Sequence, residues 1–261
     1  MNTTALAAML ILIPFWSTLS AQGTGPISPD ERPAWAVDGV PDSVWILVEE
    51  SWTTDDQDRR KNLLKQAEIQ ARAASEGRPH DVARRFALAV VLMSRSDAEG
   101  GRTRVRTTSE FHGELEAILE LDPQYAPAHH LMGRLYAGVR RANRIIRWIA
   151  THLLGGGALK QATWEAAEEH LSFADQQAPE VSDHHFQLAL LYAKTDRLEL
   201  ALEELEHVFP RPVVSHMERM VWEEALEAKE EWEQKLTRGM ERKPGCRRVG
   251  PRTRRRRAAC E

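Results

Sequence analysis

The segment "AHHLMGRLYA" (Ala128–Ala137) decides the fold, because a close counterpart, "DHHFQLALLYA" (Asp183–Ala193), follows later in the chain. Apolar residues recur three and four positions apart in both segments, which predicts that each is an α-helix. The matched pairs are His129 with His185, Met132 with Leu188, Gly133 with Ala189, and Tyr136 with Tyr192. Self-similarity of this kind indicates a protein built from repeats.

A second pattern recurs three times in the chain. In "AEEHLSFADQQAP" (Ala167–Pro179) a small or apolar residue stands at relative positions 0, 4 and 7, and a proline at 12. The same spacing occurs in "FHGELEAILELDP" (Phe111–Pro123), and its first three positions recur in "ALEELEHV" (Ala201–Val208). The two patterns together predict helix pairs. A small residue in the first helix lets the second approach closely, and the proline ends the second helix.

These patterns resemble the two helices of a tetratricopeptide repeat, most regularly from Ser182 to Val213. The resemblance implies an all-α fold, a right-handed helical solenoid of three helix pairs from Asp58 to about Phe209. A final helix from Ser215 to Leu236, opened by a capping box of Ser215 and Glu218, is expected to cap this solenoid.

One repeat is too long for this pattern. The interval from Pro123 to Pro179 is 56 residues, against about 34 in a regular repeat, so an insert of roughly 22 residues is predicted between Tyr136 and Ala167. Within the insert we expect an added amphipathic helix from about Ala142 to Leu154 that packs against the repeats. Its apolar residues are Ile145, Ile146, Trp148, Ile149 and Leu153. If these residues were exposed, they would instead form a docking surface for a partner or a membrane.

Two smaller features accompany the insert. The stretch "SDAEGGRTRVRTTSEF" is predicted to link the preceding two helices, and Thr163 is predicted to cap the helix after the insert. With the Gly-rich stop before "ATWEAA", the repeats and inserts resemble the regulator of microtubule dynamics family and its bacterial relatives, from about Gln57 to Lys229. A role at microtubules needs a cytoplasmic, eukaryotic setting, and the N-terminus argues against that setting.

The chain begins with an apolar run, "ALAAMLILIPFW" (Ala5–Trp16), of 12 residues. That length suits a signal peptide and is too short to span a bilayer, so residues 1–21 are predicted to be removed on export to the periplasm or the medium. An uncleaved membrane anchor and a helix of the fold are the alternatives. The predicted divisions that follow are a linker with a short helix (22–57), the repeat domain (58–237) and a basic, disordered tail (238–261).

The composition offers little chemistry for catalysis. The net charge of −4 combines +8 in residues 238–261 with −12 in the rest, and both cysteines, Cys246 and Cys260, lie in that basic tail. The folded part therefore has no disulfide, cysteine nucleophile or thiolate metal site. Packing explains the histidine pairs at 129–130 and 184–185, since no motif such as HExxH accompanies them. We predict no catalytic residue, metal site, cofactor or small-molecule substrate, and hence a protein that is not an enzyme.

The remaining candidate is the groove that the first helices of tetratricopeptide arrays line, which accepts peptides or helices. The residues predicted to face it are Phe86, Val90, Met93, His130, Arg134, Phe186, Leu190 and Lys194. Arg134 and Lys194 are the cations expected to hold a partner's carboxylate, and packing against neighbouring helices is the alternative for all eight residues.

The predicted function is a protein-interaction scaffold with a protein or peptide partner. A structural or assembly factor of the cell envelope and an undetected hydrolase are the alternatives. Nucleic acid is not favoured as a partner, because the basic tail lacks interleaved aromatic residues, while peripheral membrane contact stays open.

Overall fold

The computed structural model describes residues 40–142, 157–210 and 216–242. Every regular element in these ranges is a helix, which confirms the predicted all-α class for this part of the chain. The chain divides into two compact units, residues 1–178 and residues 179–261. The predicted signal peptide (1–21), the core of the added helix with Trp148, and the tail beyond Arg242 lie outside the described residues.

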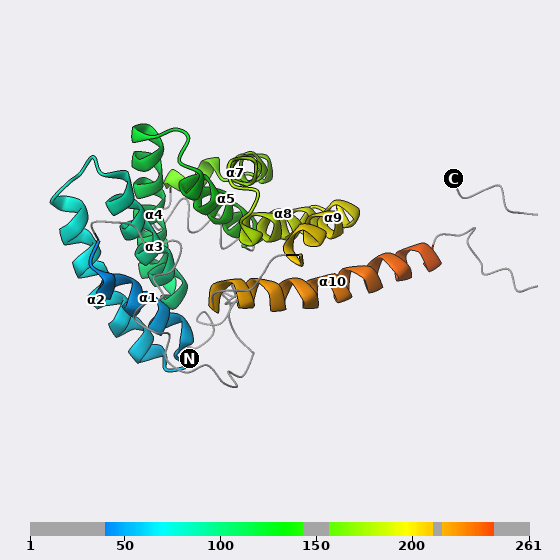
Figure 1. Ribbon diagram of the computed structural model, residues 1–261, viewed down its shortest axis with the longest axis horizontal. Coiled ribbons are helices and arrows are strands. Elements are labelled where there is room, and N and C mark those ends of the chain that lie inside the picture. Colours follow the sequence, from blue (N-terminus) through cyan, green and yellow to red (C-terminus); the bar gives the residue numbers. More distant parts are fainter. Residues whose placement is uncertain (1–39, 143–156, 211–215, 243–261) are drawn as a thin grey trace, which may run out of the picture. The chain divides into compact units, whose positions relative to one another are not determined.

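The N-terminal unit consists of helices that pack in the order in which they follow one another along the chain (Figure 1). They are α1 (Asp42–Thr53), α2 (Gln57–Glu76), α3 (Val82–Ala98), α4 (Gly101–Leu121), α5 (Ala126–Arg141), η1 (Gly157–Gln161) and α7 (Trp164–Gln177). The short 3-10 helix η1 packs against α4, and α5 packs against α7. Helix α2 begins at Gln57, next to Asp58, where the repeat helices were predicted to start.

Side chains in front of three helices fix where they begin. Asp56 and Asp81 accept hydrogen bonds from backbone N–H groups in the first turns of α2 and α3. Thr163 Oγ1 accepts a hydrogen bond from the Ala166 N–H at 3.0 Å, which confirms the predicted cap of α7. These bonds satisfy N–H groups that have no partner within their own helix.

The linker predicted between α3 and α4 is wrong, because most of that segment is helical. Helix α3 continues to Ala98 and α4 begins at Gly101, so only two residues separate them. Gly101 has a φ of 58°, a conformation that glycine adopts without the strain other residues incur. Arg104 Nε donates to the carbonyl oxygens of Ser96 and Glu99, and this satisfies acceptors at the end of α3.

Gly133 lets α5 and α7 pack closely, as predicted. A Cβ atom at this position would lie 2.6 Å from Cγ of Leu171 and 3.0 Å from the carbonyl oxygen of Ala167, both in α7. Because protein interiors are close-packed, a side chain of any size here would push the two helices apart. Ala189, which the sequence matches with Gly133, is fully buried in the C-terminal unit.

A further helix pair precedes the three pairs that the sequence predicts, because α1 packs against α2. The buried residues of α1 are Val44, Trp45, Val48 and Ser51. The residues at relative positions 0, 4, 7 and 12 of the second-helix pattern in α2 are Ala67, Ala71, Ala74 and Pro79. Sequence reasoning placed α1 in the N-terminal segment 22–57, whereas the structure packs it with the repeat helices.

The C-terminal unit contains α8 (Ser182–Lys194), α9 (Leu198–Val208) and α10 (His216–Arg242). Helices α8 and α9 form a pair, and α10 packs against both. Their core consists of Phe186, Ala189, Leu198, Ala201, Leu205, Val208, Val221, Ala225 and Trp232. The last three belong to the apolar stripe expected of a capping helix, while the Ser215 side of its capping box lies outside the described residues. None of the described helices combines the length and apolar character needed to cross a bilayer.

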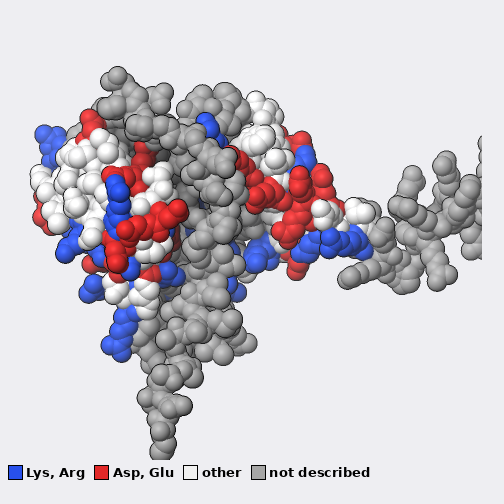
Figure 2. Space-filling model, turned by 90° about the horizontal axis from the view of Figure 1, so that it is seen from below, with Lys and Arg blue, Asp and Glu red and all other residues white. Residues whose placement is uncertain are grey.

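Acidic side chains gather on the surface of the C-terminal unit (Figure 2). The exposed acidic residues of α9 and α10 are Glu199, Glu203, Glu206, Glu227, Glu230, Glu231 and Glu233. This surface agrees with the negative charge that the sequence assigns to the body of the protein. A surface of this sign repels the phosphate backbone of nucleic acids.

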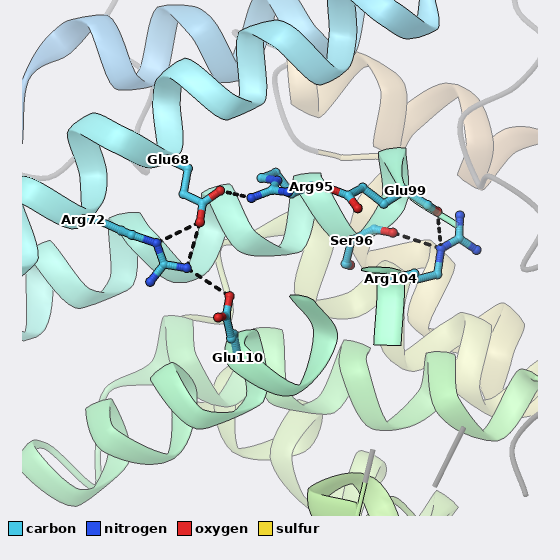
Figure 3. Close-up of polar contacts among 7 residues, drawn as sticks. All are labelled: Glu68, Arg72, Arg95, Ser96, Glu99, Arg104 and Glu110. Carbon is cyan, nitrogen blue, oxygen red and sulfur yellow. Dashed lines mark hydrogen bonds and ion pairs between the residues drawn. The ribbon is translucent and has the colours of Figure 1, made fainter. Parts of the chain in front are cut away.

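Glu68 of α2 ties three helices of the N-terminal unit together (Figure 3). Glu68 is only 9% exposed; its carboxylate accepts a hydrogen bond from Arg72 Nε at 2.8 Å and forms an ion pair with Arg95 of α3. Arg72 also donates to Glu110 of α4 at 2.9 Å, and Arg95 donates to Glu99 at the end of α3. Poorly solvated charges require partners, so Glu68 and Arg95 hold α2 against α3, and the more exposed pair of Arg72 and Glu110 extends the network to α4.

Candidate functional site

A polar contact recurs in three of the helix pairs of the described chain, and its first instance is centred on Arg85 of α3. The guanidinium donates from Nε to the carbonyl oxygen of Pro79 at 2.6 Å. It also donates from Nη1 to Oε2 of Glu114 in α4 at 2.7 Å. One side chain of the first helix therefore holds both the turn before it and the second helix of its pair.

His129 makes the corresponding contacts in the pair of α5 and α7. Its Nε2 lies 3.0 Å from the carbonyl oxygen of Pro123, and its Nδ1 lies 2.9 Å from Nδ1 of His170 in α7. The ring of Phe173 packs on this imidazole with a centroid distance of 4.1 Å. The imidazole of His129 thus takes the place that the guanidinium of Arg85 has in the preceding pair.

His185 makes the same contacts within the C-terminal unit. Its Nε2 lies 2.9 Å from the carbonyl oxygen of Pro179, and its Nδ1 lies 2.9 Å from Oε2 of Glu204 in α9. The ring of His207 stacks on it at a centroid distance of 5.0 Å. His207 follows Glu204 by three residues, as Phe173 follows His170.

The three sets share one register. The donor stands six residues after its proline, and its second partner stands three residues after the first position of the second-helix pattern. We call each set a proline bracket. The first bracket is Pro79, Arg85 and Glu114, the second is Pro123, His129 and His170, and the third is Pro179, His185 and Glu204. The recurrence of both spacings shows that these pairs are built alike.

The sequence revealed only part of this arrangement. It matched His129 with His185, but it assigned no part to Arg85, because a guanidinium and an imidazole do not align as similar residues. The usable signals were Pro79, six residues before Arg85, and Glu114, three residues after Phe111. Both place Arg85 in the register of the two histidines.

The first and third brackets set a basic side chain against a carboxylate. Arg85 is charged at any pH at which the protein folds. His185 faces two hydrogen-bond acceptors, the carbonyl of Pro179 and the carboxylate of Glu204, so its imidazolium form can donate to both. In the second bracket an imidazole, that of His170, replaces the carboxylate.

A buried histidine of α4 lies beside the second bracket. His112 Nε2 is 3.1 Å from the hydroxyl oxygen of Tyr136 and 3.1 Å from Nε2 of Gln161, and its Nδ1 is 3.2 Å from a carboxylate oxygen of Glu116. Burial lowers the pKa of His112, so this imidazole is neutral. Because Nε2 accepts from the hydroxyl or the amide, the single ring proton belongs on Nδ1, facing Glu116.

His170 is also held neutral. Burial, together with smaller effects of His129 and His112, lowers its pKa to about 4, and Glu169 opposes the shift. General acid–base catalysis at neutral pH needs a group whose pKa lies near 7, so His170 is poorly suited to it. The hydrogen bonds of His112 and His170 tie α4, α5 and η1 together and join α5 to α7. That the protein is not an enzyme and holds no metal stays a prediction.

The structure separates the eight residues predicted to face a groove into buried and accessible ones. Phe86, Val90, His130 and Phe186 are buried. Met93, Arg134 and Leu190 are half-buried, and Lys194 is exposed. Phe86 packs edge-on against Tyr125, with ring centroids 5.5 Å apart, and Phe186 belongs to the core of the C-terminal unit. The side chains that a partner could reach are therefore those of the half-buried and exposed group.

The comparison with known families gives a match to the model described as Regulator of microtubule dynamics protein 1-3, over residues 46–233. The chain belongs to this family. No curated protein sequence matches the chain significantly.

The region matched to the regulator of microtubule dynamics family begins within α1 and ends within α10. It contains all three proline brackets and the residues predicted to face a groove. In this family member the N-terminal apolar run and the basic tail fall outside the matched region. The helix pair of α1 and α2 falls largely inside it, in agreement with its packing.

Proposed function

We propose that the protein is a non-enzymatic interaction scaffold of tetratricopeptide type, in which a right-handed solenoid of helix pairs presents a groove to a protein or peptide partner. The observation that carries this proposal is the recurrence of the proline bracket in one register. Each bracket ties the first helix to the preceding turn and to its second helix. In tetratricopeptide arrays, helix pairs built alike stack so that their first helices line the binding face.

The chemistry of the accessible residues supports a peptide partner with both apolar and acidic groups. In the N-terminal unit Met93 offers an apolar contact and Arg134 a cation for a carboxylate, and in the C-terminal unit Leu190 and Lys194 offer the same two kinds of contact. The acidic surface of α9 and α10 argues against nucleic acid. The N-terminal apolar run supports the further proposal that the protein is exported. The proposed function does not include the microtubule role in the family's name.

The test is site-specific photo-cross-linking in the native host. A photoreactive amino acid at Lys194 in α8 should give discrete protein adducts, because this exposed residue stands in the first helix of its pair. The matched control carries the same group at Glu203, which is exposed on α9, the second helix. Adducts from both positions alike, or from neither, would contradict a groove on the first helices.

A further inference from the structure

The second proline bracket differs from the other two in the charge that it can hold. The first bracket pairs Arg85 with Glu114, and the third pairs His185 with Glu204, so a basic side chain faces a carboxylate in each. In the second, His129 faces His170, and two imidazoles meet with their Nδ1 atoms 2.9 Å apart. A positive charge placed on this pair by protonation therefore faces no carboxylate.

The hydrogen bonds limit how many protons this pair can take up. His129 Nε2 faces the carbonyl of Pro123, which only accepts, so this nitrogen carries a proton in every state. One proton between the two Nδ1 atoms makes the hydrogen bond. A second would set two N–H groups against each other at 2.9 Å. The closed pair therefore holds at most one of the two protons that the imidazoles bind when they are separated.

The surroundings of the pair do not supply the missing charge. On α5 the nearby ring is that of Tyr136, 5.6 Å from that of His170, and on α7 it is that of Phe173. On α4 the titratable neighbours are His112, which is neutral, and Glu116, whose carboxylate accepts a hydrogen bond from Gln161 and lies 3.2 Å from Nδ1 of His112. Glu169, on α7 itself, is exposed. The low pKa of His170, set mainly by burial, agrees with this picture.

We propose that the His129–His170 bracket makes the α5–α7 pair open in mild acid, while the brackets of Arg85 and His185 keep their own pairs closed. The opened chain binds one proton more than the closed one once the pH is below the ordinary imidazole pKa of 6.5. Stability is therefore full above pH 6.5 and falls as the pH drops toward 4. One excess proton changes the opening equilibrium about tenfold per pH unit, or roughly 30-fold from pH 6.5 to 5.

Hydrogen exchange of the full chain at pH 7.5 and pH 5.0, corrected for intrinsic rates, tests this proposal. Peptides from α5 and α7 should lose roughly 30-fold in protection at pH 5.0 relative to peptides from α3 and α4. His170→Glu should abolish this loss, because it installs the carboxylate of the other brackets. His170→Gln, which cannot titrate, should abolish it as well and serves if the charged variant folds poorly.

His80→Gln is the matched control, since His80 is exposed and lies outside every bracket, and it should behave as the unmodified chain does. Equal loss of protection in α3, α4, α5 and α7 would overturn the proposal. So would a loss confined to α5 and α7 that persists in the His170 variants.

Discussion

Gly133→Ala is expected to lower the free energy of unfolding by about 1–3 kcal/mol. Alanine is the better helix former by about 1 kcal/mol, so helix propensity alone predicts the opposite sign. The added Cβ would lie 2.6 Å from Cγ of Leu171 and 3.0 Å from the backbone oxygen of Ala167. Leucine can rotate, but the backbone oxygen moves only if α7 moves, so α5 and α7 must separate. Gly133→Leu should cost no less.

Gly138→Ala in the same helix is the control, because a Cβ at Gly138 would meet no atom within 4 Å. It should be neutral or stabilise the protein by up to about 1 kcal/mol. Urea unfolding of both variants measures the difference. A Gly133→Ala protein as stable as Gly138→Ala would show that α5 and α7 do not cross at this residue.

Glu68→Ala is expected to destabilise the protein by about 2–4 kcal/mol, because it leaves Arg72 and Arg95 without their shared carboxylate. Arg95 has a side chain only 21% exposed, so water replaces its lost partner poorly, whereas Arg72, 36% exposed, is more readily solvated. Glu110 and Glu99 still pair with the two arginines, and this keeps the cost below that of a fully orphaned buried charge. Glu68→Gln keeps the shape of the side chain and loses its charge. Its stability should lie between that of Glu68→Ala and that of the unmodified protein.

Glu50→Ala removes a carboxylate from a solvated ion pair and serves as the control. Its partner Arg59 has a side chain 61% exposed, and pairs of this kind contribute about 0–1 kcal/mol. Thermal unfolding at low and high salt distinguishes Glu68→Ala from Glu50→Ala. Salt screens the exposed Glu50–Arg59 pair and barely affects the buried Glu68–Arg95 pair. Equal losses for the two variants would mean that the Glu68 network does not hold α2, α3 and α4 together.

Features that depend on local spacing could be predicted from the sequence. Gly133 follows from its match with Ala189, and Thr163 from its place before a helical run, because helix caps and close crossings need particular residue types. The helices themselves follow from apolar residues at every third and fourth position. The register of His129 and His185 was visible for the same reason.

Features that depend on distant partners could not be predicted. Arg85 and Glu114 stand 29 positions apart, and only their spacing from Pro79 and Phe111 marks the contact, since an arginine does not align with the two histidines. The sequence predicts that "SDAEGGRTRVRTTSEF" links α3 and α4, whereas Arg104 satisfies the end of α3 and permits a short turn. Of the groove residues, Phe86 and Phe186 are buried, since large apolar side chains on a first helix also fill the space between helices.

The central claim is that the helix pairs repeat one structure. Transplantation of one bracket into another tests this claim most directly. The double variant His129→Arg with His170→Glu gives the second bracket an arginine and a glutamate, the residue types that Arg85 and Glu114 supply in the first bracket. If the registers are equivalent, the guanidinium reaches both the Pro123 carbonyl and the new carboxylate, as it does in the first pair.

The control exchanges the same two residues, His129→Glu with His170→Arg, and sets a carboxylate against the Pro123 carbonyl. We predict that the melting temperature of the first variant at pH 7 equals or exceeds that of the unmodified protein, and that the control melts well below it. Equal destabilisation of both variants would contradict the account, because two charges buried without matching geometry cost several kcal/mol in either order.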